Sequence, residues 1–232
     1  ALGLVLMPLL LLTFVPTDLL DRWQLALAQD APNRFIINVQ SDQLDPVQAF
    51  MAERKLDAPV LFPMIRGRLL EHNGTPVRGE DFANRSGDAD EDQRTQRRAE
   101  REFNLSMAQT LRHDNKVTAG RFWQGTPATP QISVEEGFAQ SLGWKVGDRI
   151  AFDIAGQRFE APITSLRSVE WESFQPNFFV LASPGALDGY PASHITAVRV
   201  PPEQTRFTAG LVQQFPDLSV IGHVAAGTST MM

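Results

Sequence analysis

The sequence predicts an α+β fold, in which strand-helix-strand units at the two ends of a domain flank a middle that is rich in hairpins. β-branched and aromatic runs alternate with a helical pattern over residues 34–70, and again over residues 195–221. Between these units, short strand-like runs are separated by turn signals such as Asn-Gly and Ala-Gly. These two observations together indicate mixed rather than all-β or all-α architecture.

The first folded unit begins after a polar, proline-containing linker. Residues 34–40 alternate and predict a strand, and residues 59–70 predict a second one. Residues 42–55 between them predict a helix, with Asp45 and Pro46 at its first turn. The apolar residues of that helix recur at three- and four-residue spacings: Leu44, Val47, Phe50 and Met51.

The middle of the chain contains two predicted helices. In residues 88–102 acidic side chains precede basic ones, an order that complements the helix dipole and predicts a solvated helical face. The sequence SVEE at residues 133–136 satisfies a capping box and predicts a helix over residues 134–142 that ends at Gly143. Asn73-Gly74 predicts a tight turn before the first of these helices.

The other elements follow from the same patterns. Residues 149–154 and 157–164 predict a hairpin around Ala155-Gly156. Further strands are expected at residues 117–123, 177–181, 195–200 and 218–221. A further helix is expected at residues 203–215. Residues 222–232 are expected to be a disordered tail or one foreign to the domain.

Charge and composition exclude several classes of function. The 232 residues include 21 basic and 27 acidic side chains, a formal net charge of −6, with the bases scattered among the acids. Nucleic-acid binding needs a basic face, so we expect no nucleic-acid partner. The chain has no cysteine, which excludes disulfides, thiolate metal sites and a cysteine nucleophile.

The uncharged stretch ALGLVLMPLLLLTFVP at residues 1–16 permits three interpretations. It is near the lower length limit of a membrane span, so residues 1–28 are interpreted as the end of a transmembrane helix followed by an amphipathic collar with Trp23 at the interface. A signal peptide cleaved after Ala28 is an alternative, although no basic residue precedes the apolar run. An ordinary buried helix is the third.

No catalytic or cofactor motif is present. The sequence lacks Gly-x-Ser-x-Gly, both glycine-rich phosphate-binding patterns, and any pair of histidines at ligand spacing. We therefore predict a protein that is not an enzyme, with no catalytic residues, no cofactor and no metal.

One segment has an unusual composition. Residues 169–179 (VEWESFQPNFF) contain four aromatic side chains, Trp171, Phe174, Phe178 and Phe179. Such residues usually pack in the core, and they can also form an apolar surface for an acyl chain or a partner. We treat these four as a candidate apolar contact surface.

Five stretches together resemble the periplasmic domain of FtsX-like ABC transporter permeases of the MacB and YbbP type. They are NRFIINVQ (33–40), PMIRGRL (63–69), REFNLS (101–106), ISVEEG (132–137) and VEWESFQPNFF (169–179). The resemblance implies a discontinuous porter-like α/β subdomain at residues 29–70 and 187–221. It also implies an inserted, strand-rich sabre-like subdomain at residues 71–186.

The same resemblance implies a function. The domain would lie in the periplasm on an inner-membrane permease, and would couple ATP hydrolysis by a cytoplasmic ATPase subunit to extraction or release of a hydrophobic, lipid-like substrate at the outer leaflet. A periplasmic esterase is implied as a further partner. Two alternatives remain from the residues alone: a secreted periplasmic lipid-binding protein or hydrolase with a cleaved leader, and an interaction module that binds no small molecule.

Overall fold

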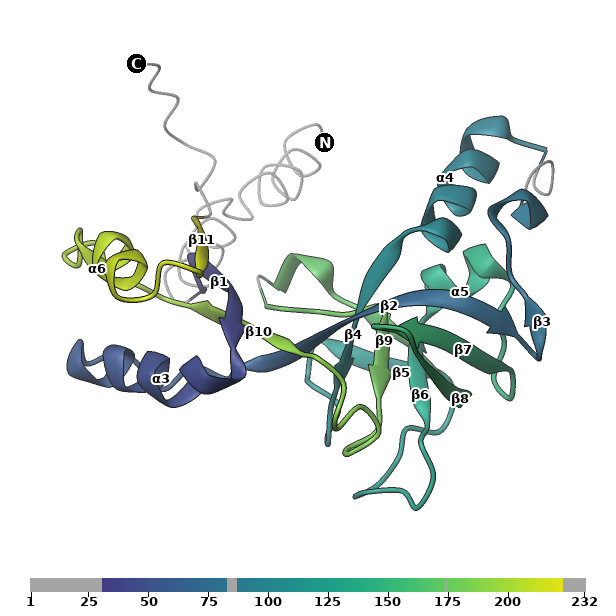
Figure 1. Cartoon of the computed structure of the whole chain (residues 1–232), viewed down its shortest axis with the longest axis horizontal. Helices are drawn as coiled ribbons and strands as arrows, with labels where there is room; N and C mark the ends of the chain where they lie inside the picture. The colour runs from purple at the N-terminus through teal and green to yellow at the C-terminus, as the bar shows by residue number, and fades with distance from the viewer. Residues whose placement is uncertain (1–30, 83–86, 174, 223–232) are drawn as a thin grey trace, which may run out of the picture.

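A computed structural model describes residues 31–82, 87–173 and 175–222 of the chain (Figure 1). The strands of this part belong to one connected sheet. In chain order they are β1 (Arg34–Gln40), β2 (Phe62–His72), β3 (Thr75–Pro76), β4 (Glu102–Met107), β5 (Asn115–Gly120), β6 (Ile132–Glu135), β7 (Arg149–Ile154), β8 (Gln157–Val169), β9 (Val180–Ala182), β10 (Ser193–Val198) and β11 (Ser219–Gly222).

Helices cover parts of this sheet. The α-helices are α3 (Leu44–Glu53), α4 (Ala89–Glu100), α5 (Glu136–Leu142) and α6 (Phe207–Gln214). Short 3-10 helices are η1 (Ser41–Gln43), η2 (Gly79–Phe82) and η3 (Trp171–Ser173). The predicted α+β class is confirmed by this mixture of helices with a largely antiparallel sheet.

The strand order is β11-β1-β10-β2-β4-β9-β6-β8-β5, with β7 paired to β2 and β8, and β3 paired to β2. Two separate hydrophobic cores lie along it. We call the part around the smaller core the terminal lobe; its buried residues include Ile36, Phe50, Met51, Phe207 and Leu211. We call the part around the larger core the central lobe; its buried residues include Leu105, Phe138, Trp144, Phe152 and Ile163.

Strands β2 and β10 connect the two lobes. Strand β10 pairs with β1 on one edge, from Ser193 to Val198 with a register shift between Ile36 and Val39, and with β2 on the other edge through Ser193–Ile195. Strand β2 then continues beyond Met64 and pairs with β4 from Ile65 onward. Figure 1 shows these strands passing between α3 and α6 at one end and the β4–β9 region at the other.

Aromatic packing holds the terminal lobe together, as the helical periodicity predicts. Phe50 of α3 meets Phe207 and Phe215 edge to face, with ring centroids 5.8 and 6.2 Å apart. This joins α3, near the start of the chain, to α6, near its end. The predicted strand at residues 34–40 and the predicted helix are confirmed, although the α-helix begins only at Leu44, after η1.

Two predicted turns are confirmed. Asn73 and Gly74 have φ of 52° and 78°, and Ala155 and Gly156 have φ of 51° and 83°. Successive positive φ values are the signature of the hairpin turn whose twist matches that of the flanking strands. Each turn therefore sets the register of a hairpin, β2–β3 and β7–β8.

The predicted capping box at residues 133–136 is wrong. Ser133 lies in β6, which pairs with both β8 and β9, and its side chain accepts a hydrogen bond from Ser165 at 2.8 Å. The helix begins at Glu136 instead, and the carboxylate of Glu135 caps it by accepting from the backbone N–H of Gly137 and Phe138. Pairing on both edges of β6 thus outweighs the local capping preference. Gly143 ends α5 with φ of 73°, as predicted.

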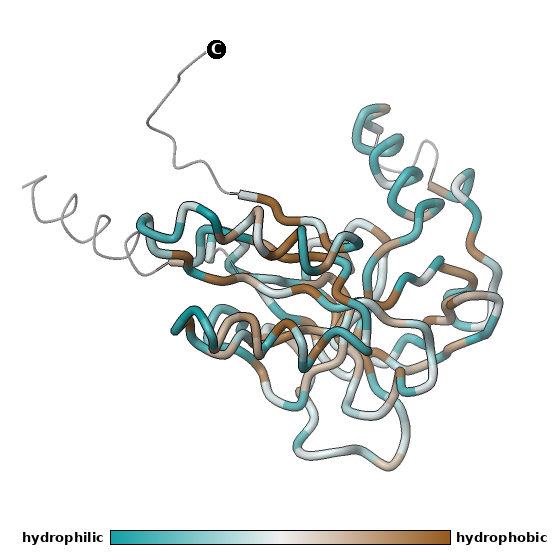
Figure 2. Tube along the Cα trace, turned by 60° about the vertical axis from the view of Figure 1, so that its left-hand side comes forward, coloured by the Kyte–Doolittle hydropathy of each residue, from teal (hydrophilic) through white to brown (hydrophobic). Residues whose placement is uncertain are grey.

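Helix α4 is confirmed within the predicted residues 88–102, and Figure 2 shows that it is hydrophilic along most of its length. Asp88 caps it by accepting from the backbone N–H of Asp90 and Glu91. The helix still buries Asp92, Thr95 and Ala99 on one side. The strand β4 that follows was not predicted.

The ends of the described fold lie together. Strand β11 pairs with β1 in antiparallel register, and Arg34 stands opposite Gly222. Within residues 31–82, 87–173 and 175–222, no helix is long and apolar enough to cross a bilayer. The predicted membrane-helix end and collar at residues 1–28, and the tail from residue 223, lie outside the described residues, whereas Gly222 closes β11.

Candidate functional site

The aromatic segment predicted as a contact surface connects β8 to β9. Trp171 in η3 is 47% exposed, whereas Phe178 is 7% exposed and Phe179 is half-buried. Trp171 and Phe179 lie with ring centroids 4.9 Å apart, and Phe179 stacks in turn on Phe138 of the core at 4.8 Å. Trp171 is therefore a half-exposed ring that packs on the half-buried Phe179, which in turn packs on the buried Phe138.

The four predicted residues do not form one surface in the described part of the chain. Phe178 lines a small apolar cavity of about 30 Å³ with Phe62 and Met107, which has room for about one water molecule. It packs within the fold. Phe174 lies outside the described residues.

A buried polar network fixes this segment to the sheet. The carboxylate of Asp114, whose side chain is almost fully buried, accepts hydrogen bonds from Ser173 at 2.7 Å and from Asn177 at 2.9 Å. Arg112 forms a bidentate ion pair with the same carboxylate and also donates to the backbone oxygen of Pro176 at 2.7 Å. One carboxylate thus anchors the aromatic segment at two positions, Ser173 and Asn177.

Two more buried groups extend the network into the sheet. Asn115 donates to Asp114 and to Asn177, each at 3.0 Å. The guanidinium of Arg167, fully buried in β8, donates to the side-chain oxygen of Asn115 at 2.6 Å and to the backbone oxygen of Phe178. Its Nε is buried without a partner in the described part of the chain.

Both buried charged groups of the network, Asp114 and Arg167, have a lowered pKa, for different reasons. Burial opposes ionisation of Asp114, but hydrogen bonds from Asn177, Ser173 and Arg112, with the charge of Arg112, outweigh burial and hold its pKa well below the usual range. Burial lowers the pKa of Arg167 to about 10, against the opposing effect of Glu135 and Asp114. Both groups are therefore charged at neutral pH.

The arrangement is structural rather than catalytic in character. A general base needs a free lone pair and a pKa near the working pH, and Asp114 has neither because four side chains donate to it. Among the described residues, no group of three or more His, Asp or Glu side chains could hold a metal ion. His72 contacts a single carboxylate, Asp148, at 2.8 Å.

The residues of this network, Arg112, Asp114, Asn115 and Arg167, were not predicted from the sequence. The alternation of β8 could have indicated that Arg167 is buried. Phe159, Ala161 and Ile163 point inward, and Arg167 is an even number of residues from each of them, so it lies on the same face of the strand. No comparable signal marked Asp114, which precedes β5 within a polar turn-like stretch.

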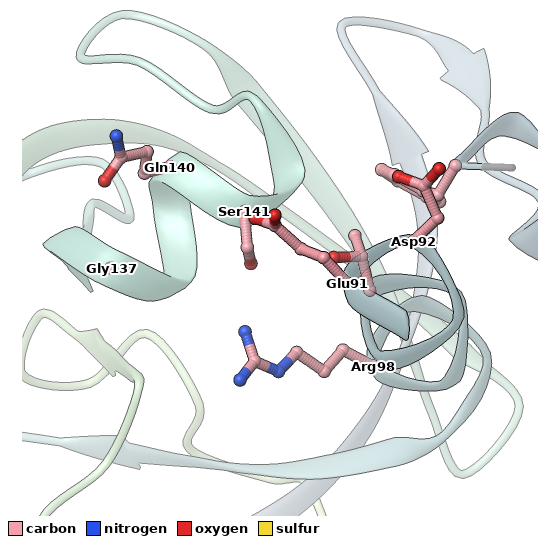
Figure 3. Close-up of a pocket in the computed structure, with 8 residues that line it drawn as sticks. Glu91, Asp92, Arg98, Gly137, Gln140 and Ser141 are labelled. Atoms are coloured by element: carbon pink, nitrogen blue, oxygen red, sulfur yellow. The ribbon is translucent and has the colours of Figure 1, made fainter. Parts of the chain in front are cut away.

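A second candidate site is a polar cavity of about 400 Å³ between α4 and α5 (Figure 3). Figure 3 shows the side chain of Arg98 extending from α4 toward α5, where Gln140 and Ser141 lie. Glu91 and Asp92 also line the cavity, so acidic and basic groups share it. This mixed charge selects no particular ligand.

A third cavity, of about 280 Å³, lies between the lobes. It is lined by the connection before β2, including Asp57 and Val60, by β10 through Val198, and by Gln175 of the aromatic segment. The aromatic segment therefore borders the junction of the two lobes, where Arg112 also stands over the ring of Phe62 at 5.2 Å.

No protein-family model matches the chain. Over 222 residues, or 95% of its length, the chain is 37% identical to the uncharacterised ABC transporter permease YbbP of Escherichia coli strain K12, and it spans about a quarter (25%) of that relative. A crystal structure of a domain of a proposed permease from Porphyromonas gingivalis aligns over 87% of this chain and 94% of that one, with 9% identity. The TM-score of this alignment is 0.40.

Proposed function

We propose that this chain, which is homologous to a segment of an ABC transporter permease, forms the extracytoplasmic domain of such a permease. In this role it couples ATP hydrolysis by a cytoplasmic ATPase subunit to the extraction or release of a hydrophobic substrate at the outer leaflet of the inner membrane. The domain itself performs no covalent chemistry.

The pairing of β1 with β11 carries this proposal. It holds the two ends of the described fold side by side, with Arg34 opposite Gly222. Adjacent ends are what a domain inserted within a longer chain requires. The relative is four times as long as the aligned region, so an insertion between two neighbouring membrane helices agrees with both observations.

The two lobes suggest how movement is transmitted. We assign the terminal lobe to the porter-like subdomain, predicted at residues 29–70 and 187–221, and the central lobe to the sabre-like subdomain, predicted at residues 71–186. The division between the lobes falls within β2 rather than after it, because Ile65 and Leu69 belong to the central core, as does Leu187. Movement of membrane helices reaches β1 and β11 first, then crosses through β10 and β2. Separate cores on a shared sheet allow the lobes to tilt while each stays packed.

The aromatic segment supplies a candidate contact surface in this scheme. Trp171 and Phe179 form its described part, and the buried Asp114 network fixes their position. An apolar substrate or a partner, such as the periplasmic esterase implied by the family resemblance, would contact this exposed ring.

The first experiment tests where the domain lies. The chain has no cysteine, so Val60→Cys, at a position 66% exposed, provides a single labelling site in a full-length permease whose other cysteines are replaced. We expect labelling by a membrane-impermeant maleimide in intact spheroplasts. A fully buried position, Val47→Cys, is the control and should not react. Reaction of Val60→Cys only after lysis would overturn the extracytoplasmic assignment.

The secreted alternative is tested on the same cells. Sequencing the N-terminus of the mature protein distinguishes the two possibilities. A protein that begins at Gln29 supports a cleaved leader, whereas retained upstream residues support the membrane-anchored permease.

A further inference from the structure

An apolar groove of about 620 Å³ lies in the central lobe, between the β5–β6 loop and the start of the β7–β8 hairpin. We call it the tip groove, and its apolar wall consists of Phe122, Trp123, Pro127, Val146, Pro162 and Ile163. Figure 1 shows the β5–β6 loop projecting from the side of the molecule opposite to β11. The groove is thus distant from the aromatic segment's inter-lobe position and from the ends of the described fold.

The groove wall is well fixed by hydrogen bonds and close packing. Phe122 stacks on Trp123 with ring centroids 3.9 Å apart, and the indole N–H of Trp123 donates to the backbone oxygen of Ala108 at 2.9 Å. The backbone N–H of Arg121 donates to Thr164 at 2.9 Å. Gly120, with φ of 72°, permits this approach, because a Cβ there would lie 2.2 Å from the Thr164 oxygen. Preformed walls reduce the entropic cost of binding.

The groove also exposes apolar area that the fold does not cover. Val146 is 42% exposed. Pro127 and Pro162 have no backbone N–H, so these parts of the wall present no main-chain donor. The volume is within the range of ligand pockets, which combine apolar walls with a few placed polar groups.

The charge of the groove is opposite to that of the chain. Arg121 is the charged residue among those lining it, and no Asp or Glu is among them, although the chain as a whole has an excess of six acidic groups. The described hydrogen bonds and ion pairs include none from the Arg121 guanidinium. This distinguishes the tip groove from the cavity of Figure 3, where Glu91 and Asp92 accompany Arg98.

We propose that the tip groove binds a monomeric long-chain carboxylate, such as a fatty acid. Its alkyl chain lies against Phe122, Val146 and Pro162, which are at least partly exposed, and its carboxylate pairs with the guanidinium of Arg121. A guanidinium is well suited to this headgroup because it can donate two parallel hydrogen bonds to a carboxylate. The inference rests on the proposed function, for which it names a substrate class.

Binding of cis-parinaric acid, a fluorescent C18 carboxylate, to this chain tests the proposal through energy transfer from tryptophan. We expect saturable binding that palmitate displaces and hexadecanol displaces at least tenfold less well. Val146→Asp should weaken binding at least tenfold, because it places a carboxylate in the groove. Val117→Asp is the matched control, since Val117 is similarly exposed (40%) on β5, outside the groove, and it should bind as the original chain does.

Arg121→Gln provides a second variant at an exposed position, so folding is not at risk. We expect about a tenfold loss of affinity for parinarate, whereas Arg66→Gln, at another exposed arginine, should have none. Equal binding by the two valine variants, equal displacement by palmitate and hexadecanol, or binding that does not saturate would overturn the proposal. The maleimide experiment does not depend on these results, so the extracytoplasmic assignment would stand even if the tip groove bound no fatty acid.

Discussion

The two lobes of this domain are held together in different ways. The terminal lobe has a core of aliphatic and aromatic side chains, in which Phe50, Phe207 and Phe215 meet across two helices. The central lobe has a larger apolar core and, beside it, buried charged and amide groups, with Asp114 and Arg167 at their centre. Apolar burial is non-directional, whereas a buried ion-pair network requires one geometry.

This difference bears on function. A core of apolar side chains tolerates small rearrangements, as suits a lobe joined to moving membrane helices. The Asp114 network holds the aromatic segment in one position relative to the sheet. We therefore expect substitutions in the network to displace Trp171, and substitutions in the terminal core to alter stability alone.

Asp114→Ala should have the largest effect. It removes the acceptor for Arg112, Ser173, Asn115 and Asn177 and leaves the charge of Arg112 without its partner. Loss of one partner from a buried pair costs about 3–5 kcal/mol. Urea unfolding measures this loss, with Asp188→Ala at an exposed position as the control. A loss below about 1 kcal/mol would show that the network does not hold the lobe together.

The same carboxylate predicts a pH dependence. The pKa of Asp114 in the folded chain lies below its unfolded value of about 3.9. Its contribution to the free energy of unfolding is therefore complete above that value and is lost as pH falls toward the folded pKa. Asp114→Asn should reduce the fall in stability on acidification below about pH 4. If the free energy of unfolding fell equally with pH in the original chain and in Asp114→Asn between pH 2 and 5, Asp114 would not be ionised in the folded chain as assigned.

A pair of substitutions to leucine compares the lobes directly. Asn115→Leu removes hydrogen bonds to Asp114, Asn177 and Arg167 inside the central lobe and should cost about 2–3 kcal/mol. Phe50→Leu keeps an apolar side chain in the terminal core and should cost about 1 kcal/mol. Urea unfolding of both variants measures the difference. Equal losses would mean that the two lobes are not distinguished by the directionality of their contacts.

Much of the fold could be predicted because apolar periodicity and turn chemistry are local signals. The strand at residues 34–40, the helix through Phe50 and the Ala155-Gly156 hairpin follow from such patterns. Ser133 was misassigned because the capping rule is local, while the pairing of β6 with β8 and β9 depends on residues about 30 and 47 positions away. Pairing between distant strands leaves no pattern in a short window of sequence.

The candidate sites were harder to predict for the same reason. The composition of residues 169–179 located the aromatic segment, but not that Phe178 faces a cavity of about 30 Å³ while Trp171 is exposed. Asp114 acquires its role from Ser173 and Asn177, about 60 residues later in the chain. The tip groove likewise combines the β5–β6 loop with the connection before β7 and the middle of β8, and has no contiguous sequence motif.

The smallest effect on stability, and the one that best separates the two interpretations of the aromatic segment, is expected for Trp171→Ala. Because Trp171 is half exposed and contacts Phe179 on one side, its removal should change the free energy of unfolding by about 1 kcal/mol or less. Trp144→Ala is the matched control, since Trp144 is buried in the central core and should cost about 3–5 kcal/mol.

The second measurement on these variants is the ATPase activity of the complete permease complex. If Trp171 is a contact surface, Trp171→Ala lowers the increase in ATP turnover produced by substrate, although the domain stays folded. If Trp171 is only a peripheral part of the core, the substrate-stimulated ATP turnover should fall only in variants that lose stability. Trp171→Ala, which stays folded, should then be stimulated by substrate as the original protein is. A large loss of stability from Trp171→Ala would place the ring among the residues that hold the central lobe together and would remove the argument for a contact role.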